Sequence, residues 1–157
     1  MRFDIQVEKP SLGRLQRKET WKYPLEALRE AVINALIHRD YTITGEIQVR
    51  LYEDRLVISN PGRLPEGITP EQLREPEHLS IPRNPLLAQV FYYAGLIEKW
   101  VTETTRIIEL CRAQNLPDPK FEELSNAFKV IFFKDLLSAT QRARTNREVK
   151  KDYTIFT

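Results

Sequence analysis

Two segments of this chain fold back on themselves as strand pairs, and they limit the folds that the chain can adopt. In the first, residues 47–52 alternate apolar and polar side chains, and residues 56–58 return after a tight turn. In the second, residues 121–124 and 127–133 flank another short turn. Alternation with a period of two is typical of half-buried strands joined as hairpins. Consecutive hairpins predict a largely antiparallel or mixed sheet.

A first helix is expected ahead of the first hairpin. Pro24 begins it at a position where the missing N–H of proline costs nothing, and the pattern fades near His38. Its apolar residues recur at helical spacing, which predicts one buried stripe. The stripe is expected to consist of Leu25, Leu28, Val32, Ala35 and Leu36.

Two further helices are expected between the hairpins. Asn84 precedes proline and is predicted to be the N-cap of a helix over residues 85–94. A third helix is expected to start at Thr102 or Thr104 and to stop before the prolines of residues 117–119.

The order of elements predicts an α+β fold. A short strand near residues 3–7 precedes the first helix, and residues 60–84 form one long loop, with a helical turn after residue 69. Hairpins and helices in this order favour a two-layer sandwich whose helices cover one face of the sheet. A connection as long as residues 60–84 is usually functional.

Length and composition predict one domain that needs no disulfide or structural metal to fold. The chain has 157 residues, a formal net charge of +2 and a single cysteine, Cys111. We expect one domain over residues 1–137 and a basic, polar tail over 138–157. One cysteine, no apolar leader and no membrane-spanning run favour the bacterial or archaeal cytoplasm. The small net charge argues against direct nucleic-acid binding by this chain alone.

One acidic and one amide side chain share a face of the first helix. Glu30 and Asn34 are four residues apart, so together they could hold a divalent metal or a water and a metal. The ordinary alternative is a solvated helix face. At the end of this helix, His38 and Arg39 are interpreted as cations that complement the helix dipole, with a phosphate contact as the alternative for Arg39. Asp40 is interpreted as a cap, a partner of Arg39 or a catalytic group.

The residues around this pair resemble a known family. Residues 23–41 resemble the N-box of the GHKL ATPases, the superfamily that includes gyrase and the histidine kinases. Three more segments, residues 58–65, 83–88 and 95–100, narrow the resemblance to the ATP-binding domain at the C-terminal end of transcriptional regulators and RecG-like ATP-dependent helicases. The resemblance implies the Bergerat type of α/β sandwich, with ATP and Mg²⁺ as cofactors.

The resemblance also implies a role for each matching residue. Asn34 would coordinate magnesium, and Glu30 would position or deprotonate the attacking water. Asn60 stands where an aspartate usually accepts a hydrogen bond from adenine. The remaining candidates are Gly62 in the first glycine box, Arg83 as a phosphate contact at the end of the lid, and Thr102 in the last box.

The last box departs from the family pattern. The family reads tryptophan, glycine, threonine, glycine, whereas this chain has Val101 and Glu103 in place of the glycines. Glycines let backbone N–H groups approach phosphate, and a carboxylate there would repel it. Two functions therefore stay open. The first is an ATP-binding module, with slow hydrolysis, of a transcriptional regulator or helicase-related protein, coupled to a partner domain or protein. The second is a degenerate nucleotide site that serves dimerisation or protein interaction.

Overall fold

The computed structural model describes residues 5–7, 19–76, 80–97 and 103–134. Its centre is a four-stranded sheet of order β3-β4-β6-β5, in which every neighbouring pair is antiparallel. The strands are β3 (Gln48–Leu51), β4 (Arg55–Pro61), β5 (Lys120–Leu124) and β6 (Ala127–Phe133). Both predicted hairpins are confirmed, and β4 and β6 join them in the middle of the sheet.

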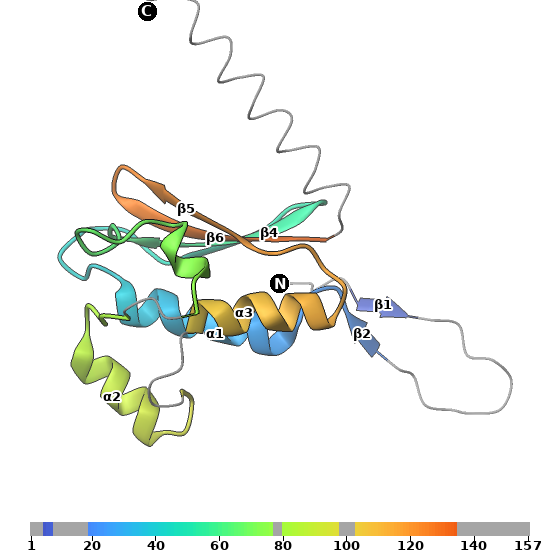
Figure 1. Cartoon of the computed structure of the whole chain (residues 1–157), viewed down its shortest axis with the longest axis horizontal. Helices are drawn as coiled ribbons and strands as arrows, with labels where there is room; N and C mark the ends of the chain where they lie inside the picture. The colour runs from blue at the N-terminus through green and yellow to red at the C-terminus, as the bar shows by residue number, and fades with distance from the viewer. Residues whose placement is uncertain (1–4, 8–18, 77–79, 98–102, 135–157) are drawn as a thin grey trace, which may run out of the picture.

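The helices lie on one face of this sheet (Figure 1). They are α1 (Leu25–His38), α2 (Pro85–Tyr93) and α3 (Glu103–Ala113). In the figure, α1 and α3 lie side by side beneath the strands, and α2 lies beyond them on the side away from the sheet. The predicted two-layer α+β sandwich is confirmed.

The core lies between the sheet and the paired helices. On α1, Ala27, Ala31 and Ala35 are almost completely buried. Their small side chains recur every four residues, so the helix backbone can approach its neighbours closely. The facing side chains belong to the sheet and to α3, and include Leu56, Ile58, Phe132, Val130, Ile107 and Cys111.

The predicted apolar stripe of α1 is only partly right. Ala35 is buried, and Leu28 and Val32 pack against the core while partly exposed, but Leu25 is 47% exposed. The alanines, together with Ile33 and Ile37, take the buried positions instead. Side-chain size alone misleads here, because the tightest contact of a helix favours its smallest residues.

Two local predictions need correction. Strand β4 continues through Asn60 and Pro61, which pair with Phe128 and Ala127, so these two residues belong to the sheet and not to the loop. A strand that was not predicted, β2 (Glu19–Trp21), pairs with β1 (Ile5–Val7). The predicted division at residue 137 stays a prediction, because residues 135–157 lie outside the described residues.

Asn84 is the N-cap residue of α2, as predicted, but its side chain does not cap that helix. It makes no side-chain capping bond there; instead its Nδ2 donates to the carbonyl oxygens of Ile37 (2.7 Å) and Arg39 (2.8 Å). These carbonyls end α1, where the last turn leaves acceptors without helical partners. Asn84 therefore closes the C-terminus of α1 from a distant segment, while Pro85 begins α2 as predicted.

Candidate functional site

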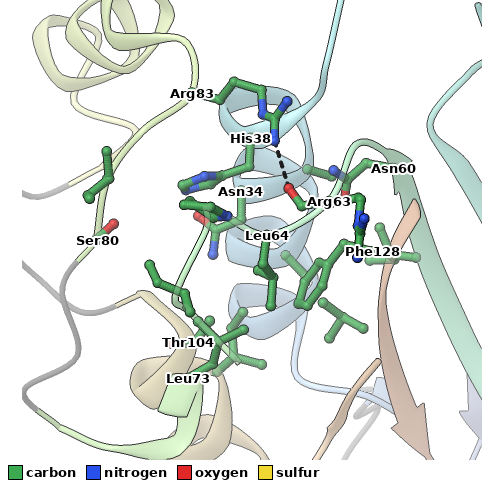
Figure 2. Close-up of a pocket in the computed structure, with 18 residues that line it drawn as sticks. Asn34, His38, Asn60, Arg63, Leu64, Leu73, Ser80, Arg83, Thr104 and Phe128 are labelled. Carbon is green, nitrogen blue, oxygen red and sulfur yellow. Dashed lines mark hydrogen bonds between the residues drawn. The ribbon is translucent and has the colours of Figure 1, made fainter. Parts of the chain in front are cut away.

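A pocket opens between α1, the inner face of the sheet and the segment that follows β4 (Figure 2). We call residues 62–84 the lid segment; it contains the short helix η1 (Gln72–Arg74), which confirms the predicted helical turn. The space free of protein atoms is about 810 Å³, a volume that includes open solvent. The part that admits the centres of water molecules is about 70 Å³, so the pocket is narrow in this conformation.

The lining is mostly apolar, with a few polar groups at its edges. Its residues come from α1 (Ala31, Asn34, Ala35, His38), the sheet (Ile58, Asn60, Phe128, Val130), the lid segment (Arg63, Leu64, Pro65, Ile68, Leu73, Ser80, Ile81, Arg83) and α3 (Thr104, Ile107). In Figure 2, Leu64 of the lid segment lies between the α1 side and Phe128 of the sheet. Apolar lid side chains therefore take up much of the space.

Asn34 provides the most informative polar atom of the pocket. Among the buried side-chain oxygen and nitrogen atoms of the described residues, only Asn34 Oδ1 has no hydrogen-bond partner. A buried acceptor without a partner costs about 1–3 kcal/mol, so such an atom in a pocket is a natural ligand position. Magnesium can bind an amide oxygen as one of its ligands. The residue therefore fits the predicted metal, with the remaining ligands left to water and phosphate.

Asn60 lies across the pocket from Asn34. It is 4% exposed, and its backbone is fixed by pairing with Phe128 of β6. Figure 2 shows the two asparagines on the helix and strand sides of the same space. Both predicted nucleotide contacts thus line one pocket, separated by its apolar middle.

Glu30 does not belong to the lining of this pocket. Its side chain is buried, and Oε1 lies 3.8 Å from Nε of Arg106 on α3. One helical turn separates it from Asn34, so it lies at the α1–α3 contact beside the pocket. An arginine at that distance attracts the carboxylate and orients it, and also competes with any water for it.

The two ends of the lid segment are held together. Arg83 donates from Nη1 to Asp40 Oδ2 (2.8 Å) and from Nη2 to the carbonyl oxygen of Arg63 (2.7 Å), the bond dashed in Figure 2. Glu123 of β5 accepts from the backbone N–H of Leu64 (2.8 Å). Arg83, predicted to be a phosphate contact, therefore lines the pocket. Its guanidinium donates to Asp40 and Arg63 and so holds the two ends of the lid segment together.

Asp40 is a structural acceptor in this arrangement. Hydrogen bonds from Thr42, and then the charge of Arg83, hold the pKa of Asp40 below its usual range. Arg39 turns away from it, with its guanidinium over the ring of Tyr41 and a hydrogen bond to the carbonyl oxygen of Gly45. The predicted Asp40–Arg39 pair is therefore replaced by an Asp40–Arg83 pair.

Gly62 packs behind the pocket rather than lining it. Its φ is +118°, and an added Cβ would lie 3.0 Å from Asp40 Cβ and 3.1 Å from Asp40 N. Such a backbone conformation suits glycine alone. The glycine lets β4 meet the loop after α1, which positions Asp40 for Arg83.

His38 was interpreted as a cation, and this interpretation is wrong. Burial, and then the nearby charge of Arg83, lower the pKa of His38 to about 4, so the imidazole is neutral at pH 7. It lines the pocket one turn after Asn34. Its position on the same helix face, four residues from Asn34, is the sequence signal that could have placed it in the site.

The last predicted contact, Thr102, lies outside the described residues, as does Val101. The described part of α3 begins at Glu103, and Thr104 in its first turn lines the pocket. The N-terminal end of α3 therefore faces the site, the end of a helix that favours anions.

The described residues contain no metal site built from protein side chains alone. They contain no group of three or more histidine, cysteine, aspartate and glutamate side chains that could hold a metal ion.

Cys111 is buried in the core, as predicted, and burial raises the pKa of its thiol to about 12. No helix in the described ranges combines the length and apolarity that a membrane span requires.

Comparison with known proteins identifies the family. The model described as "Putative ATP-dependent DNA helicase recG C-terminal" matches residues 45–132, more than half of the chain. The chain belongs to this family. The match to this RecG C-terminal family, an ATPase-like domain, covers the sheet, the lid segment, α2 and α3 and includes Asn60, Gly62 and Arg83. Residues Glu30 and Asn34 precede the matched range.

One solved structure extends the likeness to most of the chain. The DIP2311 protein from Corynebacterium diphtheriae is 28% identical, with a TM-score of 0.67 over 83% of this chain. This chain spans 25% of the length of that protein. Among curated proteins no match is found.

Proposed function

We propose that this domain binds ATP with Mg²⁺ in the pocket between α1, the sheet and the lid segment. The observation that carries the proposal is the buried, unpartnered Oδ1 of Asn34, a residue that lines the same pocket as Asn60. Membership of an ATPase-like family and the resemblance to the GHKL N-box both support it. Bound magnesium would screen the phosphate charge that the protein must otherwise meet.

Each side chain has a defined part in this proposal. Asn34 supplies one oxygen to the metal, and Asn60 offers an uncharged amide to the base. The first turn of α3 and Arg83 face the phosphates. Glu30 orients a water, and Arg106 competes with that water for the carboxylate, so hydrolysis is slow.

The narrow pocket sets a requirement on the lid segment. Leu64, Ile68 and Leu73 pack against the core from this segment, and they occupy space that a nucleotide needs. Binding therefore requires these side chains to move outward, while Gly62 and the sheet stay in place. In the longer proteins of its family, such a movement would couple nucleotide state to a partner domain of a cytoplasmic transcriptional regulator or helicase-related protein. Nucleic acid would be contacted by other parts of that protein.

Calorimetry of ATP and ADP with Mg²⁺ tests the proposal on the intact chain. Asn34→Ala should abolish the binding heat without lowering stability, because the substitution removes a buried acceptor that has no partner. Gln89→Ala, an amide truncation on exposed α2, is the matched control and should bind like the parent. No heat from the parent at millimolar nucleotide contradicts the proposal.

The alternative function, a degenerate site that serves protein interaction, is favoured by the small room left in the pocket. Val101→Gly with Glu103→Gly would restore the two glycines of the family pattern. If the site is degenerate, the double variant gains nucleotide affinity that the parent lacks. A parent that already binds nucleotide as tightly as the double variant excludes this alternative.

A further inference from the structure

Helix α2 carries an apolar stripe on its solvent side. Leu86, Val90 and Tyr93 are 78%, 60% and 77% exposed, and α2 has no buried residue. Spacings of four and three place these side chains on one helix face. Figure 1 shows α2 beyond α1 and α3, on the side away from the sheet. We call Leu86, Val90 and Tyr93 the α2 stripe.

The α2 stripe is held in a fixed orientation. At one end of α2 the backbone N–H of Asn84 donates to the carbonyl oxygen of Ile37, at 3.1 Å. Beyond the other end, Arg29 Nη2 donates to the carbonyl oxygen of Leu96, at 3.0 Å. Both partners lie on α1, so polar bonds anchor the helix at its two ends while the side chains of its apolar outer face are largely exposed.

The charge pattern indicates what covers this face. Residues 84–97 contain no charged side chain, in a chain of which 29% is charged. In a two-fold contact each residue near the axis meets its own copy, so a charge there would repel itself. The segment avoids that repulsion entirely. A partner recognised by charge would find nothing to pair with along the same 14 positions.

We propose that the α2 stripe is the contact between two copies of this chain, packed antiparallel about a two-fold axis near Val90. Leu86 of each copy then packs against Tyr93 of the other, and the two Val90 side chains meet at the axis. The stripe spans about 10 Å of helix, less than the roughly 800 Å² per partner of a standard interface requires. The dimer is therefore weak and depends on concentration.

Sedimentation equilibrium of the whole chain, without nucleotide, tests this proposal. Concentrations up to about 1 mM reveal even a dimer with a millimolar dissociation constant. The parent should show a monomer–dimer equilibrium, and Val90→Arg should weaken it at least tenfold. Leu124→Arg places the same charge at another exposed apolar residue, at the end of β5, and should leave the dimer unchanged. A monomeric parent, or a dimer that Val90→Arg does not weaken, overturns the proposal.

A charge-swap experiment tests the axis itself. Val90→Glu alone should be as monomeric as Val90→Arg, because like charges meet in each homodimer. An equimolar mixture of the two variants should recover a dimer, since opposite charges then meet. Circular dichroism of each variant checks that the fold is intact. A mixture that stays monomeric while both variants are folded overturns the proposed packing, and nucleotide affinity has no part in any of these readouts.

Discussion

The guanidinium of Arg83 donates a 2.8 Å hydrogen bond to the carboxylate of Asp40, 43 residues earlier in the chain. The same guanidinium also donates to the carbonyl oxygen of Arg63 at the start of the lid segment. One side chain thus joins the end of the lid segment to its beginning and to the loop after α1. We call this set of bonds the lid latch.

Arg83→Ala and Asp40→Ala should each loosen the lid segment. The pair is partly exposed, so we expect amide exchange over residues 63–76 to become only roughly two- to fivefold faster. The double variant should lose less than the sum of the two single losses, since both changes break the same Asp40–Arg83 bond. Hydrogen exchange by mass spectrometry measures this. Additive effects in the double variant would show that the two residues act separately.

Gly62→Ala should destabilise the domain by about 2–3 kcal/mol, because it combines positive-φ strain with a clash against Asp40. Gly67→Ala is a matched control: its φ is also positive, at +84°, but nothing lies within 4 Å of an added Cβ. That change should cost only about 1 kcal/mol. Urea denaturation of both variants gives the comparison. Equal losses would mean that the contact with Asp40 relaxes freely.

Asn84→Ala should lower the free energy of unfolding by about 1–2 kcal/mol, because the carbonyl oxygen of Arg39 loses its donor. Ile37 keeps the backbone N–H of Asn84 as a partner. Asn84→Asp should be worse than alanine, since a carboxylate would face two carbonyl oxygens at the negative end of α1. Urea denaturation measures these differences. If Asn84→Asp were as stable as the parent, the Asn84 side chain would instead cap the N-terminus of α2.

The free energy of unfolding should decrease as the pH is lowered, because of His38. Its folded pKa of about 4 lies below the unfolded value of 6.5, so the unfolded chain binds a proton first. The stabilisation is complete above pH 6.5 and is lost as the pH falls toward 4, by about 2 kcal/mol at pH 5. His38→Gln should remove this part of the pH dependence. Urea titrations at pH 7 and pH 5 measure it, and identical slopes in parent and variant would contradict the assignment.

Local patterns in the sequence predicted the elements of the fold well. The two hairpins, the helical turn at η1 and the limits of the three helices depend on period and on turn residues, which act over a few positions. Strand β2 was missed because three residues, Glu19–Trp21, are too few to show a period. Asn60 was placed in a loop because its pairing with β6 is long-range.

The sequence indicated which residues line the candidate site, but not the contacts that these residues make. Asn34, Asn60 and Arg83 do line one pocket. Arg83 contacts Asp40 and Glu30 contacts Arg106, and neither pairing follows from spacing, because each joins distant elements. The neutral state of His38 likewise depends on burial and on a charge from the lid segment, which a linear pattern does not contain.

The binding of metal and nucleotide at Asn34 can be observed by crystallography with Mn²⁺ and a non-hydrolysable ATP analogue. Anomalous scattering locates the manganese. We predict a peak within about 2.2 Å of Asn34 Oδ1, bridged to the phosphates and lost in Asn34→Ala. Nucleotide bound with its metal away from Asn34, or a pocket still filled by Leu64 and the other lid side chains at saturating analogue, would contradict the proposed function.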